Sequence, residues 1–349
     1  MTSKFNFETG VYRPPSEGGS HSLLLRVSRN CPWNQCAFCG MYKTEKFELR
    51  SAAEVKQDID AIAAMRDGLK NISRELGYGG ELNRETVMTL LEREPGLNTH
   101  HGFVMVFHWL QSGAKTAFLQ DGNSLIMKTR NLVEILRHLR KTFPTIERVT
   151  TYARAKTISK KSQEDLSAIR DAGLDRLHVG LESGDDAVLK RIKKGVTGDE
   201  HIAAGIKALE AGFQLSEYWM PGVGGKEMSE QHARNTARVL SAINPHYVRS
   251  RPFFPFPGSP MQDWVEKGEF KLMTAREVLS EIRLMVSELN LSSKVCFDHA
   301  GNYWRNPAGG LVFSHSYEGY RFPDEKKHLL AQIDEGIRVQ PDEPVIMRL

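Results

Sequence analysis

Short apolar runs alternate with amphipathic stretches along most of the 349-residue chain. Six runs have the length and composition of strands, and each is followed by a stretch with apolar residues at helical spacing, as in "LVEILRHLRKTF". The predicted strands cover residues 22–30, 115–123, 148–154, 175–184, 214–222 and 246–254. Strands and helices that alternate for six rounds predict a parallel sheet with right-handed crossovers.

This order of elements predicts an α/β fold, a partial (βα)6 barrel of the TIM type. Such barrels carry their functional residues at the carboxyl ends of the strands. We expect an N-terminal extension over residues 1–21, the barrel over 22–257, and a C-terminal extension over 258–349 that covers the barrel mouth. A helical insertion over about 67–113 follows the first helix, which is predicted to begin at Ser51.

Charge and hydropathy limit the classes of partner and the compartment expected for the protein, but they do not identify its substrate. The net charge of +4 and the pI of 8.7 permit an anionic substrate or a nucleic acid and require neither. No apolar run is long enough to span a bilayer, and the first residues show no apolar core of a signal peptide. We therefore expect a cytoplasmic protein, in which clustered cysteines bind a metal or take part in catalysis.

Three of the four cysteines lie within "RVSRNCPWNQCAFCGMYK". Cys31, Cys36 and Cys39 follow the first predicted strand with the spacing C-x4-C-x2-C, and Cys296 lies far away, where a buried core position is expected. Thiolates bind soft metals and hold [4Fe–4S] clusters. Three thiolates from one loop would leave the fourth iron open to a small molecule, as in catalytic metal sites that keep one position free.

These features resemble the radical S-adenosylmethionine (SAM) superfamily. The cysteine loop after the first strand of a six-unit barrel, with an aromatic residue before the third cysteine, is similar to the cluster-binding loop of that superfamily. Three later segments resemble the fourth-, fifth- and sixth-strand segments of the branch that contains oxygen-independent coproporphyrinogen oxidases, methylthiotransferases and Elongator-type enzymes. They are "GLESGDDAVLKRIKKG", "MPGVGGKEMSEQHARNTARVL" and "RPFFPFPGSPM".

The resemblance implies an enzyme with two cofactors, a [4Fe–4S] cluster and SAM. In the superfamily, an electron from the cluster cleaves the sulfonium of SAM, and the resulting 5′-deoxyadenosyl radical abstracts hydrogen from a substrate. The resemblance also implies an external electron donor of the flavodoxin or ferredoxin type. We expect a small-molecule substrate and no membrane partner.

The resemblance further implies roles for individual residues. The cluster ligands are Cys31, Cys36 and Cys39. Asp121 in "LQDGNSL" stands where the superfamily has the glutamate of a Gly-Gly-Glu segment. The residues expected to bind SAM are Phe38, Gln120, Asp121, Asn123, Arg154, Glu182, Ser183, Gly222 and Arg251. Asp298 and His299 of "DHAGN" are the catalytic candidates, expected at the barrel mouth.

Several alternatives stay open at the level of the residues. A structural zinc site or an electron-transfer iron–sulfur site would make the protein a non-catalytic metal binder, although zinc normally takes four ligands. A radical SAM enzyme that acts on RNA is another alternative. The usual spacing in the superfamily is C-x3-C-x2-C, so the longer first loop leaves open which sulfonium bond is cleaved. The basic run "KRIKK" (190–194) is predicted to be a solvated helix face.

Overall fold

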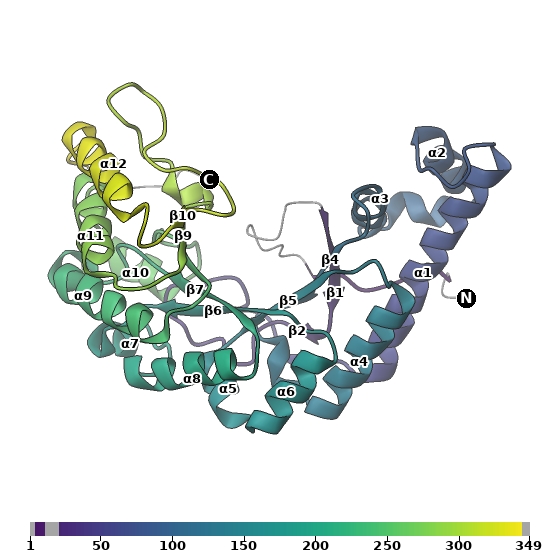
Figure 1. Cartoon of the computed structure of the whole chain (residues 1–349), viewed down its shortest axis with the longest axis horizontal. Helices are drawn as coiled ribbons and strands as arrows, with labels where there is room; N and C mark the ends of the chain where they lie inside the picture. The colour runs from purple at the N-terminus through teal and green to yellow at the C-terminus, as the bar shows by residue number, and fades with distance from the viewer. Residues whose placement is uncertain (1–3, 11–20, 344–349) are drawn as a thin grey trace. The chain divides into compact units, whose positions relative to one another are not determined.

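The computed structural model describes residues 4–10 and 21–343 (Figure 1). Most of the predicted N-terminal extension and the last six residues, 344–349, therefore lie outside the described residues. The chain divides into two compact units. The first comprises Met1–Asn30, Phe47–Tyr152 and Glu164–Arg176, and the second comprises Cys31–Lys46, Ala153–Gln163 and Leu177–Leu349. The predicted boundaries at residues 21 and 257 remain a prediction.

The first unit is built on three parallel strands in the order β1-β4-β5. These are β1 (Ser22–Arg26), β4 (Thr116–Gln120) and β5 (Arg148–Ala153). The helices are α1 (Ala52–Glu75), α2 (Arg84–Arg93), α3 (Phe103–Gln111), α4 (Thr129–Thr142) and α6 (Gln163–Asp171). Figure 1 shows α1 and α4 side by side, and the two helices are in contact.

Local sequence signals explain where α1 begins. The Ser51 hydroxyl accepts a hydrogen bond from the N–H of Glu54, and the Glu54 carboxylate accepts one from the N–H of Ser51, at 3.2 and 2.8 Å. This capping box satisfies two of the N–H groups that a helix start leaves without partners. The predicted start at Ser51 is confirmed, and the helix runs further than its apolar spacing indicated.

The second unit contains five strands in the order β6-β7-β8-β9-β10. They are β6 (Arg176–Glu182), β7 (Gln214–Trp219), β8 (Tyr247–Ser250), β9 (Lys294–Cys296) and β10 (Tyr320–Arg321). Strands β7, β8 and β9 pair in parallel, and β10 runs antiparallel to β9. The helices are α5 (Ala155–Lys160), α7 (Asp186–Arg191), α8 (Gly198–Glu210), α9 (Gly225–Ile243), α10 (Pro260–Glu266), α11 (Ala275–Glu288) and α12 (Lys326–Val339). Helix α11 packs against both α9 and α12 (Figure 1).

The α/β class and the partial-barrel type are confirmed, because each of the six predicted strands is present and helices follow them along the chain. Two details differ from the prediction. The first strand ends at Arg26, and the next residues form β2 (Ser28–Arg29), which pairs with β3 (Glu48–Leu49). The C-terminal extension also supplies β9 and β10, which are too short to show an alternation of apolar and polar residues.

Successive side chains along each strand of the second unit point to opposite faces of the sheet. On β7, Glu217 contacts His201 of helix α8 at 2.9 Å, so this face is covered by helices. The neighbouring Ser216 points to the opposite face, where its hydroxyl lies 3.3 Å from Nε of Arg249 on β8. Polar side chains therefore line the face away from the helices. No helix among the described residues is both long and apolar enough to cross a membrane.

Candidate active site

Ala37 anchors the cysteine loop, residues 31–46, to the rest of the second unit. The N–H of Ala37 donates to the carbonyl of Ile192 at 2.9 Å, and the carbonyl of Ala37 accepts from the N–H of Met261 at 3.0 Å. The Ala37 side chain is fully buried in a cluster of apolar side chains that includes Ile192 and Met261. Both backbone groups and the side chain of one residue thus fix the loop between its second and third cysteines.

The residue after the third cysteine must be small. A Cβ atom at Gly40 would lie 2.3 Å from Cδ1 of Phe256 and 2.7 Å from the carbonyl oxygen of Pro257. Contacts this short do not occur between real side chains, so a larger residue would push the backbone next to Cys39. Close packing therefore explains a glycine at this position without any demand for an unusual backbone angle.

Two cations lie close to the second thiol. Burial raises the pKa of Cys36, and the charges of Lys194 and Arg154 act in the opposite direction. The guanidinium of Arg154 lies 4.6 Å from the ring centroid of Trp33 and donates to the carbonyl of Lys194 at 2.6 Å. Arg154 is thereby held beside the loop by a residue of the loop itself, Trp33.

The donor set fits an iron–sulfur cluster in kind and number. Cys31, Cys36 and Cys39 are free thiols on one loop, and positive charge beside Cys36 partly opposes the rise in its pKa that burial causes. Among the described residues, no three His, Cys, Asp or Glu side chains converge on the position of a single metal ion. A cubane does not require such convergence, because each thiolate binds its own iron atom.

Glu182 at the end of β6 forms a buried ion pair that the sequence reading missed. Its Oε1 lies 2.9 Å from Nζ of Lys194, and the two side chains are 11% and 9% exposed. The prediction of a solvated run over 190–194 was therefore wrong at its last residue. Helix α7 ends at Arg191, and Lys193 has a φ of 53°, so Lys194 no longer follows the exposed helix face. The glycine at 195 was the available signal, since glycine commonly follows a helix end.

The other predicted residues of the second unit lie at strand ends or in the extension. Ser183 is buried directly after β6, and Gly222 lies in the turn after β7 with a φ of 84°. The ring centroid of Phe38 lies 5.9 Å from Nζ of Lys194. The guanidinium of Arg251 lies 5.5 Å from the ring centroid of Tyr218. Each has the strand-end or loop position expected of it, and their roles at SAM remain a prediction.

Asp298 and His299 lie just after β9. Asp298 accepts from Nη1 of Arg249 at 2.7 Å, and Arg249 is only 1% exposed. Burial lowers the pKa of His299 to about 4, and the charge of Arg251 adds to this effect, so His299 is neutral at neutral pH. Neither observation tests the catalytic roles predicted for these two residues.

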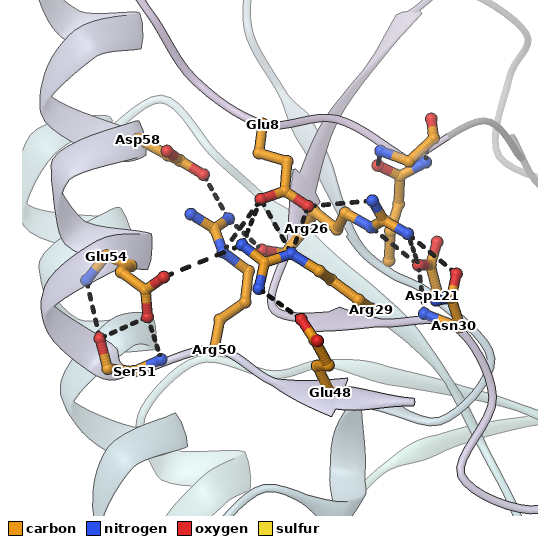
Figure 2. Close-up of polar contacts among 12 residues, drawn as sticks. Glu8, Arg26, Arg29, Asn30, Glu48, Arg50, Ser51, Glu54, Asp58 and Asp121 are labelled. Atoms are coloured by element: carbon orange, nitrogen blue, oxygen red, sulfur yellow. Dashed lines mark hydrogen bonds and ion pairs between the residues drawn. The ribbon is translucent and has the colours of Figure 1, made fainter. Parts of the chain in front are cut away.

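Gln120, Asp121 and Asn123 belong to the first unit, at and just beyond the end of β4. Figure 2 shows the Asp121 carboxylate facing Arg26 and Asn30. Its Oδ2 accepts from Nε of Arg26 and from the N–H of Asn30, each at 2.9 Å. The side chain of Gln120 makes two hydrogen bonds to the backbone of Gly10, and Asn123 is 1% exposed.

Glu8 organises the same region of the first unit (Figure 2). It accepts from Arg26 at 2.9 Å and from Arg29 at 2.7 Å, and Nε of Arg50 lies 3.6 Å away. These cations lower the pKa of Glu8, although burial opposes them as the largest single influence. The sequence reading named none of these residues, because only folding brings an N-terminal glutamate to three arginines.

Fold and site together define a class: an α/β protein of the partial-barrel type with a three-thiol loop after its first strand. The comparison with protein families agrees. Residues 103–240 match the family described as "Radical SAM superfamily". Its members are enzymes that use a [4Fe–4S] cluster and SAM, and they need a reductant and a substrate. This match agrees with the predicted superfamily and its cofactor pair.

Several solved structures also match this chain. Methylornithine synthase (PylB) is 17% identical, with 78% of this chain and 65% of that chain covered and a TM-score of 0.44. Elp3 from the archaeon Methanocaldococcus infernus is 14% identical, with 71% and 58% covered and a TM-score of 0.46. The methyltransferase TsrM from Kitasatospora setae is 16% identical, with 70% and 39% covered and a TM-score of 0.46.

The chain spans less than two thirds of the length of each of these three proteins. A comparison with curated proteins gives no match.

Proposed function

We propose that this chain binds a [4Fe–4S] cluster through Cys31, Cys36 and Cys39 and cleaves SAM reductively to start radical chemistry on a small molecule. The observation that carries the proposal is the loop itself: three free thiols on one anchored loop, with Arg154 and Lys194 acting on Cys36. When bound, the cluster supplies the electron that breaks a sulfonium bond of SAM.

The residues of the chain would have three tasks in this function. Ala37 holds the middle of the cysteine loop against the second unit, so that the thiols keep a constant spacing. Arg154 supplies a planar guanidinium suited to a carboxylate such as that of SAM. Glu182 supplies a carboxylate for the amino group or the ribose of SAM, and Lys194 orients that carboxylate through their hydrogen bond.

The substrate would meet the polar face of the second unit near β8 and the end of β9. Asp298 and Arg249 form one ion pair there, and His299 is held neutral by burial. Among the described residues, Nη2 of Arg249 has no hydrogen-bond partner although the side chain is buried. An acceptor on a small substrate would satisfy that N–H group. An external flavodoxin or ferredoxin would deliver the electron, in a reducing compartment such as the cytoplasm.

Anaerobic reconstitution with iron and sulfide tests the proposal. We expect about four irons per chain, absorbance at about 400 nm and, with dithionite and SAM, 5′-deoxyadenosine as the product. Cys36→Ala should lose most of the iron, whereas Cys296→Ala should keep it, because Cys296 is a buried thiol remote from the loop in sequence. Full iron binding and SAM cleavage by Cys36→Ala would refute the assignment, and methylthioadenosine as the product would show that a different sulfonium bond is cleaved.

A further inference from the structure

A chain of buried polar contacts connects two loops of the second unit. Oγ of Ser183, in the turn after β6, lies 2.8 Å from Nδ1 of His232 on α9. Nε2 of His232 lies 3.6 Å from Oε1 of Glu281 on α11. The same Oε1 accepts a hydrogen bond at 2.6 Å from the backbone N–H of Gly222, in the turn after β7.

Further contacts hold the members of this chain. Oγ of Ser183 accepts from the N–H of Asp185 at 3.0 Å in addition to its hydrogen bond with Nδ1 of His232. Burial lowers the pKa of His232 to about 4, so the ring is neutral. Its Nε2 lies 3.6 Å from Oε1 of Glu281, a close contact that is longer than a hydrogen bond. The chain therefore consists of a hydrogen bond at each end and this contact between the two side chains.

All three side chains are hidden from solvent. Ser183 and His232 are 0% exposed and Glu281 is 3% exposed. Burying an imidazole beside a carboxyl group costs free energy unless their polar atoms are paired. An apolar pair would pack between α9 and α11 at lower cost, so the polar pair requires a further reason.

A second buried pair shows what a purely structural contact looks like here. His201 lies 2.9 Å from Glu217, and both are at most 1% exposed. Both residues lie within regular elements, α8 and β7. The chain through His232 differs, because it ends on two turns that follow β6 and β7, each of which carries a residue predicted to bind SAM.

We propose that His232 and Glu281 are positioning residues that hold the turn at Ser183 and the turn at Gly222 in the arrangement that binds SAM. This inference rests on the proposed function. His232 orients the hydroxyl of Ser183, directly beside Glu182, and Glu281 fixes the backbone of Gly222. The two turns are thereby coupled through the helices behind them rather than through direct contact.

The affinity for SAM tests this inference. In the reconstituted protein under anaerobic conditions, equilibrium dialysis with SAM should give a Kd at least tenfold higher for His232→Leu than for the unsubstituted protein, at equal iron content. Glu281→Gln should stay within about threefold, because the amide oxygen still accepts from the N–H of Gly222. His201→Leu is the matched control: it removes an equally buried imidazole and should leave the Kd unchanged, whatever it does to the melting temperature.

Hydrogen exchange separates failure of this inference from failure of the proposed function. It is measured on the protein without SAM, so it needs no activity. His232→Leu should speed exchange at least fivefold in both turns, around residues 183–185 and 220–225, and His201→Leu should not. If His232→Leu does not fold, Ser183→Ala, which removes one oxygen, replaces it with the same expected directions. Unchanged exchange in the turns, or an unchanged Kd at equal iron content, would overturn the proposal.

Discussion

Nζ of Lys194 lies 2.9 Å from Oε1 of Glu182, and both side chains are about nine-tenths buried. Removing one partner would leave a buried charge without compensation, which costs about 3 kcal/mol or more. Lys194→Met should therefore lower the free energy of unfolding by about 3 kcal/mol in urea titrations. The double variant Lys194→Met/Glu182→Gln should recover most of this loss. A loss below about 1 kcal/mol for Lys194→Met would contradict a buried, paired carboxylate at Glu182.

The carboxylate of Asp121 accepts from Arg26 and from the backbone of Asn30 (Figure 2). Asp121→Asn removes its charge, so we expect a loss of about 2 kcal/mol in the free energy of unfolding. Glu48→Gln is the control, since Glu48 pairs with Arg29 at an exposed position and should cost less than about 1 kcal/mol. Equal effects of the two substitutions would show that Asp121 is not held as the structure shows.

Gly40 offers a test of how rigidly the cysteine loop is packed. Gly40→Ala places a methyl group against Phe256 and Pro257, so the backbone beside Cys39 must shift. We expect the iron content after reconstitution to fall at least twofold, measured per folded chain. Gly96→Ala is the control, because a Cβ there meets no atom within 4 Å. Full iron content in Gly40→Ala would mean that the loop adapts without loss.

The pKa of Glu281 leads us to predict that the free energy of unfolding depends on pH. Burial raises its pKa to about 7, well above the usual value for a glutamate, so the folded protein holds the carboxyl proton more tightly than the unfolded chain does. The stabilisation is complete below the unfolded pKa and is lost as the pH rises through 7. Relative to Glu281→Gln, the unsubstituted protein should lose about 3 kcal/mol of unfolding free energy between pH 4.5 and 8.

The neighbouring His232 titrates in the opposite sense. Its pKa is lowered to about 4, so its contribution is present above the ordinary pKa of histidine and is lost as the pH falls. Both proteins in the comparison keep His232, so the difference between their unfolding curves, measured at several pH values, isolates Glu281. A difference that does not vary with pH would contradict a protonated carboxyl at this position.

Most of the strands could be predicted from the pattern of apolar and polar residues. Runs such as "SLLLR" and "TAFLQ" are apolar on both faces, which is typical of strands covered on both sides, and the six strands were placed correctly. Strands of two or three residues were not found. Tyr320 and Arg321 form a strand only because Val295 and Lys294 lie opposite them, and such pairing has no local period.

The sequence by itself determined which thiols are available to bind a cluster, because the three cysteines lie close together along the chain. It also determined the alternation of strands and helices, which depends on hydrophobic period. Only the tertiary structure decided which charges are paired. Lys194 became the partner of Glu182, and His232 the link between Ser183 and Glu281, because burial makes an unpaired polar group costly and folding brings distant partners together.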